Sequence, residues 1–366
     1  MRLLDKKIAR FTFLTWIFLF TLPTSAMSLD LGLAGQFNAF VLNDMTASHS
    51  DVEGRLAVGG NLNLQHYAIG MELGNSQGYR DDLIVGGALN FSDGRVYNGN
   101  ARSGGTATIE RVGFYSEDQI NRLNGNYIAG NPIDFSQIGG ELADKSRLWG
   151  NLSVNGLVDF ESWGGLTLAG DDPTLNIFSI SAEQLGSTTK FLLDIPDSAR
   201  ALINVTGKNV TMQGFGFYRQ EDGVPVNDDD GRIPDNAPPK RHDGLLTQNI
   251  LFNFIEAEVL EAYAIGIKGS ILAPLADMIF YNGHIDGNLI VNSLSSKPGE
   301  YTGQVNYYPF MGMTESSSAI PEPPHVALIV IFLFGLVIKT HTTPQRRIAG
   351  KLIKNQRCSL TIEINT

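Results

Sequence analysis

The chain has 366 residues, a formal net charge of −11 and one cysteine, Cys358, so no intrachain disulfide can form. Between two basic ends, residues 27–338 carry 17 basic and 36 acidic side chains, a net charge of −19, and 39 of the 40 glycines. So acidic a body repels phosphate backbones, which excludes a nucleic-acid-binding role, and a hydrophobic content of 43% excludes wholesale disorder.

Residues 1–26 have the layout of a secretory signal peptide. A basic stretch ends at Arg10, an apolar run follows over 11–20, and small residues lead to Ala26. We expect export with cleavage after Ala26. An uncleaved membrane anchor is the alternative, but the apolar run is short for a span of about 20 residues.

Few helices are predicted in the body of the chain. Apolar residues at helical spacing predict a short amphipathic helix within 31–42, and Ser116 and Ser181 are each placed to begin a helix or a single helical turn. Elsewhere short apolar–polar alternations are separated by Gly, Asn and Asp, which is typical of strands and turns.

One seven-residue pattern recurs four times: an apolar residue, any residue, Gly, a polar residue, Leu or Ile, any residue, and Val or Ala. Its copies begin at Val52, Leu148, Ile267 and Ile285, and the last two lie 18 residues apart. A related pair of segments, 56–64 and 83–91, is separated by 27 residues. Such repeats predict a mainly β fold, a right-handed β-helix (solenoid) with a few short flanking α-helices, and place the glycine on the apolar face of its strand. An antiparallel sandwich is the alternative.

Two long stretches, 37–61 and 249–294, resemble the choice-of-anchor A domain, and the resemblance extends over roughly 35–310. It implies an exported bacterial protein of β-helical, adhesin type that carries one of several interchangeable surface anchors. The domain is therefore expected to occupy residues 27–313.

The C-terminal region resembles the PEP-CTERM sorting signal. A Ser/Pro linker over 314–325 contains Pro321, Glu322 and Pro323, an apolar run follows, and Arg346 and Arg347 begin a basic end. We expect a membrane helix over 326–343 and a basic cytoplasmic tail over 344–366. The resemblance implies processing by an exosortase-like membrane cysteine transpeptidase; a plain C-terminal anchor is the alternative.

The acidic segment 219–244 is a candidate calcium site because it clusters carboxylates before a glycine turn. Its candidate ligands are Asp228, Asp230 and Asp235, although Val226 stands where a complete EF-hand loop requires Asp or Asn. The alternative is a solvated loop held extended by prolines, and no other cofactor is expected.

The sequence offers little for catalysis. The carboxylate pairs Asp81–Asp82 and Asp171–Asp172 are expected to serve turns or strand starts, because neighbouring strand residues point to opposite faces. Two histidines, His49 and His284, are expected at surface turns. An ice- or mineral-binding face would need a repeated Thr-x-Thr row, and the one at Thr106 is not repeated at coil spacing.

These observations predict an exported protein of the cell surface or extracellular matrix, with an adhesive or structural role. Its expected partners are an exosortase-like enzyme, the membrane through the C-terminal helix, and an extracellular polysaccharide or matrix ligand bound on a broad coil face. The alternative is a β-helical carbohydrate-active enzyme, a polysaccharide lyase or hydrolase, with carboxylates and a basic residue converging in a groove.

Overall fold

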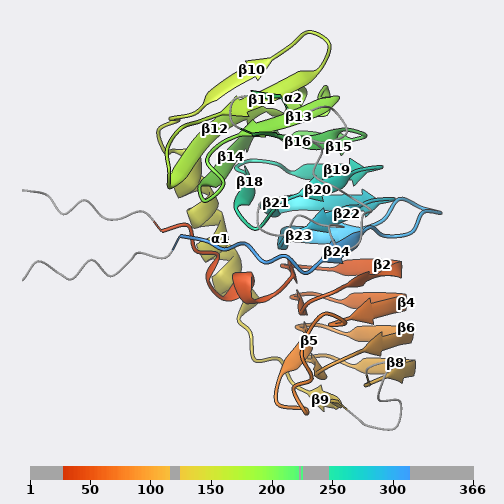
Figure 1. Cartoon of the computed structure of the whole chain (residues 1–366). Helices are drawn as coiled ribbons and strands as arrows, with labels where there is room; N and C mark the ends of the chain where they lie inside the picture. The colour runs from red at the N-terminus through yellow and green to blue at the C-terminus, as the bar shows by residue number, and fades with distance from the viewer. Residues whose placement is uncertain (1–27, 116–123, 222–223, 226–246, 314–366) are drawn as a thin grey trace, which may run out of the picture. The chain divides into compact units, whose positions relative to one another are not determined.

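Short parallel strands stacked as successive rungs dominate the chain (Figure 1). The computed structural model describes residues 28–115, 124–221, 224–225 and 247–313, all within the unit Met1–Thr314. These residues form three parallel stacks, which are the faces of a solenoid. The mainly β solenoid predicted from the repeats is therefore confirmed, and the antiparallel sandwich is wrong.

The first stack is buried on both sides except toward β7 and β9 at one end, and we call it the helix-covered face. Its order in space is β12 (Leu175–Ser181), β14 (Arg200–Thr206), β18 (Ile250–Phe254), the first parts of β21 (Ser270–Tyr281) and β23 (Leu289–Ser295), β1 (Ala39–Val41), β3 (Leu56–Val58), β5 (Asp81–Val85), β7 (Asn100–Ser103) and β9 (Tyr127–Ala129).

The second stack has one buried and one exposed side, and we call it the polar face. It consists of β15 (Asn209–Gln213), β19 (Val259–Tyr263), the later parts of β21 and β23, then β2 (Met45–Val52), β4 (Leu62–Ile69), β6 (Leu89–Val96) and β8 (Ala107–Gly113). Apolar and polar residues alternate along β2 and β4, as expected for strands with one solvated side.

The third stack contains short strands. Five form a separate sheet: β10 (Leu157–Phe160), β11 (Gly165–Ala169), β13 (Lys190–Asp194), β16 (Gly216–Glu221) and β17 (Val224–Pro225), of which β10 and β17 are antiparallel to their partners. The others are β20 (Gly266–Lys268), β22 (His284–Asp286) and β24 (Gln304–Asn306), and Val305 of β24 pairs with Val52 of β2.

The order of the coils in space departs from the order of the chain. Strand β1 lies between β23 and β3, so the first coil of the chain is inserted between its last coil and its second coil. The first and last described segments of the domain are also joined: Leu29 and Met313 exchange two backbone hydrogen bonds of 3.0 Å.

The long helix α1 (Phe135–Gly150) runs beside the helix-covered face (Figure 1). Its Leu142 and Trp149 share one buried apolar cluster with Phe40, Leu251 and Ile290 of that face. A second and larger apolar cluster fills the interior of the solenoid. Because the central strands of the helix-covered face are buried on both sides, some of them carry consecutive apolar residues, as in 289–291.

The helix predictions were partly wrong. Residues 31–42 contain a 3₁₀-helix, η1 (Gly32–Gln36), and then strand β1, because Phe40 and Val41 are buried on opposite sides of a strand. The pattern copy at Leu148 lies at the end of α1 and not in a strand, and α1, with 16 residues, is not short. Ser181 does begin a helix, α2 (Ala182–Gly186), with a complete capping box. The helix start expected at Ser116 lies outside the described residues.

The repeated spacings correspond to coils in contact. Ile267 pairs with Ile285, and Leu56 pairs with Leu83, so 18 and 27 residues are each one turn of the solenoid. In the other three copies the repeated glycine, Gly54, Gly269 or Gly287, lies at a corner between strands and not on the apolar face as predicted. A Cβ on Gly287 would lie 2.6 Å from the backbone carbon of Gly269 in the preceding coil, so the coils approach too closely there for a side chain.

Among the described residues, no helix is long and apolar enough to cross a membrane. The predicted helix over 326–343 lies outside them.

Candidate binding face

The exposed side of β2, β4, β6 and β8 presents polar side chains in two straight rows. Parallel register places equivalent residues of successive coils next to one another. One row is Thr46, Asn63, Asn90 and Thr108, and the other is Ser48, Gln65, Ser92 and Glu110. Strand spacing makes each row a repeat of hydroxyl or amide groups about every 4.8 Å.

The rows are open to solvent and nearly uncharged. Glu110 is the single charged member, and Asn90 donates to Asn63 in the next coil through a 2.9 Å side-chain hydrogen bond. Together the two rows line a shallow hollow of about 510 Å³. The body of the chain has a net charge of −19, but this face is nearly uncharged. It therefore offers donors and acceptors to neutral hydroxyl groups and does not strongly repel anionic groups.

A column of four residues borders the polar face, and we call it the corner column: His49, His66, Asp93 and Arg111. They occupy equivalent corner positions of successive coils, and each has a positive φ between 51° and 54°. Non-glycine residues seldom adopt this conformation, which costs of the order of 1 kcal/mol each, and clusters of such residues occur at functional sites.

Direct contacts connect the corner column. The imidazole rings of His49 and His66 lie 4.6 Å apart between centroids, and Tyr301 stacks on His49 at 4.2 Å. Farther along, Arg111 donates two hydrogen bonds of 2.5 and 2.7 Å to Asp93. Those bonds hold the pKa of Asp93 below its ordinary value.

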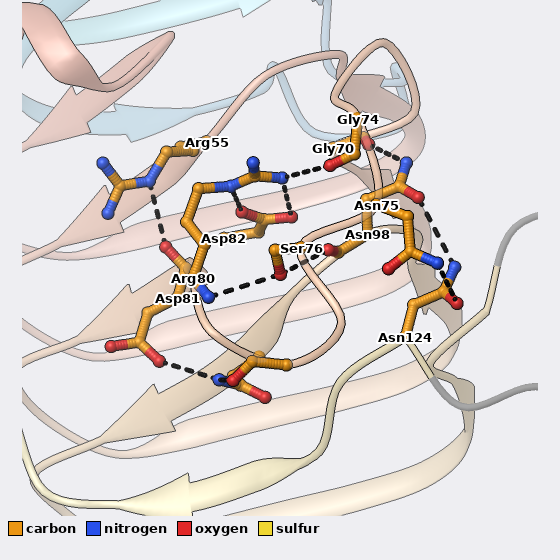
Figure 2. A network of polar contacts seen from close by, with 12 residues as sticks. Arg55, Gly70, Gly74, Asn75, Ser76, Arg80, Asp81, Asp82, Asn98 and Asn124 are labelled. Atoms are coloured by element: carbon orange, nitrogen blue, oxygen red, sulfur yellow. Dashed lines mark hydrogen bonds and ion pairs between the residues drawn. The ribbon is translucent and has the colours of Figure 1, made fainter.

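The carboxylates Asp81 and Asp82 belong to a polar network at another corner of the solenoid (Figure 2). Arg102 binds Asp81 at 2.6 Å, while Arg80 forms hydrogen bonds of 2.5 and 3.1 Å with the fully buried Asp82. Burial raises the pKa of Asp82, and the hydrogen bonds from Arg80 oppose that rise.

Further contacts of the network fasten the loop 70–81 to neighbouring coils. Asn75 donates to Asn124, and Ser76 donates to the carbonyl oxygen of Asn98 (Figure 2). Each of these groups has a structural partner, which fits the predicted strand-start role of Asp81 and Asp82 better than a catalytic one.

The second carboxylate pair also serves a turn. The side chain of Asp172 accepts hydrogen bonds from the backbone N–H groups of Thr174 and Leu175 and from the Thr174 hydroxyl, which lowers the pKa of Asp172. Both histidines predicted at surface turns lie within strands: His49 is exposed, as predicted, but belongs to β2, and His284 is half-buried in β22, where its Nε2 is 4.0 Å from the buried Asp286.

The predicted site residues cannot be compared with this geometry. The candidate calcium ligands Asp228, Asp230 and Asp235 lie outside the described residues, as do the sorting motif Pro321, Glu322 and Pro323 and the basic residues Arg346 and Arg347. In the part of the chain that is described, no group of three or more His, Cys, Asp or Glu side chains could hold a metal ion.

Sequence reasoning missed both the polar rows and the corner column. Segments 45–52, 62–69 and 89–96 share an alternating pattern, and aligning them would have placed His49, His66 and Asp93 in register. The spacing between these segments is uneven, which hid the alignment.

Comparison with known proteins gives a family and several distant structural neighbours. Residues 30–303 match the profile of a family described as "Putative Ice-binding-like adhesive domain". No curated protein matches the chain.

Three solved structures are similar to it. An ice-binding protein from the Antarctic ascomycete Antarctomyces psychrotrophicus is 12% identical, over 76% of this chain and 98% of that chain, with a TM-score of 0.34. An ice-binding protein from an Antarctic biological consortium is 11% identical, over 78% and 92%, with a TM-score of 0.30. One from an Antarctic bacterium, Flavobacteriaceae, is 10% identical, over 76% and 96%, with a TM-score of 0.27.

Proposed function

Because the chain belongs to the family of ice-binding-like adhesive domains, we propose that it is an exported adhesive protein of the cell surface or extracellular matrix. Its ligand is a neutral, hydroxyl-rich extracellular polysaccharide, bound on the polar face. The observation that carries this proposal is the pair of in-register rows on β2, β4, β6 and β8.

The chemistry of the rows suits a polymer better than a small molecule. Amides and hydroxyls both donate and accept hydrogen bonds, so a repeated row can pair with repeated sugar hydroxyls. Each contact is weak in water, about 0.5–1.5 kcal/mol, and affinity therefore requires many contacts along an extended ligand. The broad, shallow hollow supports this mode of binding.

An ice surface is the second candidate, suggested by the family description alone. The row that begins at Thr46 has threonine only at its two ends, Thr46 and Thr108, with Asn63 and Asn90 between them. This row favours flexible amide hydrogen bonding over a rigid array of methyl and hydroxyl groups. Measurement of ice growth in the presence of the protein distinguishes the two surfaces.

We retain the finer assignments as parts of the same proposal. Residues 1–26 form a cleaved signal peptide, 27–313 a choice-of-anchor A domain, 314–325 the linker, 326–343 a membrane helix and 344–366 the basic tail. The solenoid winds in the right-handed sense that parallel crossovers almost always adopt. An exosortase-like enzyme recognises Pro321–Pro323, and the segment with Asp228, Asp230 and Asp235 stays a hypothetical calcium site.

An adhesive role is favoured over the activity of a polysaccharide lyase or hydrolase. The family supports a non-enzymatic role, and Asp81, Asp82 and Asp172 supply structural bonds. A glycosidase needs two carboxyl groups about 5–9.5 Å apart across a substrate.

The binding proposal is tested with full-length protein on a panel of immobilised polysaccharides. We expect retention on at least one neutral polysaccharide, and at least a tenfold loss of affinity in Asn63→Ala/Asn90→Ala. The matched control is Gln137→Ala/Glu141→Ala, which removes an exposed hydrogen-bonded pair from α1 and is expected to bind normally. Equal binding by all three proteins would reject the polar face as the site.

A further inference from the structure

Three polar side chains form a completely buried row in the third stack. Lys268 of β20, Asp286 of β22 and Asn306 of β24 occupy paired positions on successive strands. The Lys268 ammonium donates to Asp286 Oδ2 at 2.6 Å, and the Asn306 amide donates to Asp286 Oδ1 at 2.6 Å. One carboxylate thus contacts both an amine and a carboxamide.

The row points away from the solenoid interior but is covered on its outer side. Ile267, Ile285 and Val305, each next to a member of the row, belong to the interior apolar cluster. Lys268, Asp286 and Asn306 nevertheless have no exposed surface. The Asn38 amide contributes to the cover, because it donates to the carbonyl oxygens of Gly287 and Asn306.

Stability alone does not account for this row. Removing a lysine and a carboxylate from water costs several kcal/mol each, and well-packed apolar residues at such positions are often as stable or more stable. A buried lysine in a site closed to water is, however, a strong nucleophile once its proton moves to a neighbouring base. The row places the nucleophile, the base and an acyl group together.

We propose that Lys268 and Asn306 become joined by an intramolecular isopeptide bond, with Asp286 as the proton carrier. The proton of the Lys268 ammonium moves to Asp286 along their hydrogen bond, which leaves a neutral amine. The amine nitrogen attacks Cγ of Asn306, and a C–N bond forms while protonated Asp286 stabilises the developing oxyanion.

The intermediate then loses the original amide nitrogen. The amine nitrogen gives up a proton, the bond from Cγ to Nδ2 breaks, and Nδ2 leaves as ammonia after accepting a proton through Asp286. The ammonia then takes the remaining proton from Asp286, which returns to the carboxylate form. The products are one secondary amide and one ammonium ion, formed from one ammonium group and one carboxamide. No oxidant, metal or external cofactor takes part.

The fold permits the new bond. Lys268 and Asn306 are two strand spacings apart, or about 9.6 Å between backbones. A nearly extended lysine side chain can cover this distance to the Asn306 acyl carbon. The amine must leave Asp286 Oδ2 and pass along the carboxylate. The bond would tie β20 to β24 across β22, next to the junction where Val305 pairs with Val52 of the first coil.

Such a link would hold the last coils together under a pulling force. It rests on the Lys268–Asp286–Asn306 contacts and not on the polar face, so the proposed adhesion and the proposed bond can fail independently.

The test is the mass of the purified full-length protein and of its tryptic peptides after denaturation. We expect the protein to be lighter than its processed sequence by one ammonia, trypsin not to cleave after Lys268, and fragmentation to join Lys268 to Asn306. A full mass with cleavage after Lys268 would overturn the proposal. Loss of ammonia with normal cleavage there would also overturn it, because that result indicates a cyclised asparagine.

Variants assign the roles. Asp286→Asn keeps the shape of the carboxylate but cannot carry the proton, and Asn306→Ala lacks the acyl group, so both are expected to have full mass and normal cleavage. Lys208→Arg is the matched control, since Lys208 forms an exposed ion pair with Glu258, and it should retain the link. A link that persists in Asp286→Asn would refute the role of Asp286.

Discussion

Replacing Asn253 with alanine should weaken the attachment of α1 to the helix-covered face. Asn253 is fully buried, and its amide donates to the Ser146 carbonyl oxygen and to Asn204 Oδ1, both at 2.8 Å. Its Oδ1 accepts a 2.6 Å hydrogen bond from the Ser146 hydroxyl. Asn204 in turn donates to the carbonyl oxygen of Trp149, so one network connects β14 and β18 with the end of α1.

The expected cost follows from the groups left behind. The substitution leaves the Ser146 hydroxyl and Asn204 Oδ1 buried without these partners, at about 1–3 kcal/mol each. We therefore expect the free energy of unfolding to fall by about 2–6 kcal/mol, a large part of the 5–15 kcal/mol typical of a folded domain. Urea unfolding followed by tryptophan fluorescence measures this loss, and Trp149 reports from the same junction.

The control is Asn90→Ala, which breaks an exposed amide–amide hydrogen bond of similar length and should change the free energy by less than about 0.5 kcal/mol. If Asn253→Ala lowered stability by no more than the control, the network would not be what holds α1 to the sheet.

Three further predictions concern the coil corners, acid stability and sorting. Gly86→Ala should destabilise the protein by about 1–3 kcal/mol, because the new Cβ would meet the carbonyl oxygen of Gly59 in the preceding coil. Gly140→Ala, in open space on α1, should instead stabilise it by about 0.5–1 kcal/mol. Equal melting temperatures of the two variants would contradict the close approach at Gly86. Because the pKa of Asp172 is lowered in the folded state, its contribution to stability is present above the unfolded pKa and lost as pH falls through the folded one. Asp172→Asn should therefore lose less stability than the wild type on acidification below about pH 4, and identical acid unfolding curves would reject that role. Changing Pro321, Glu322 and Pro323 to alanine should leave unprocessed protein in the membrane fraction, whereas normal tail removal on an immunoblot would reject the motif.

The solenoid could be predicted because its repeats are local. The pattern beginning at Ile267 and again at Ile285 gives the length of one coil directly, and those residues are neighbours in adjacent strands. The capped turn at Ser181 could be predicted for the same reason, since a capping box involves residues only three positions apart.

The arrangement of the coils could not be predicted in this way. Insertion of β1 between β23 and β3 depends on pairings such as Ala39 with Leu289, 250 residues apart, which no local pattern encodes. The copy of the repeat at Leu148 was misleading because its first apolar position, Leu148, lies in helix α1 and is exposed, and its last, Val154, is exposed as well. Sequence spacing alone cannot distinguish a short apolar segment in a helix from one in a strand.

The candidate face depends on register, which is why the sequence did not reveal it. Asn63 and Asn90 are ordinary exposed residues until β4 and β6 are placed side by side. The corner column is less predictable still, because His49 and His66 adopt a conformation in which glycine or asparagine is expected.

Hydroxyl-radical footprinting of the full-length protein, with and without a retained polysaccharide, tests the account most directly. Tyr301, which stacks against the corner column beside the polar face, is 61% exposed, and Trp163, near β10 and β11, is 60% exposed. Binding on the polar face predicts that oxidation of Tyr301 and His66 falls while oxidation of Trp163 is unchanged. Protection of Trp163 with Tyr301 and His66 still fully oxidised would place the ligand elsewhere and contradict the account.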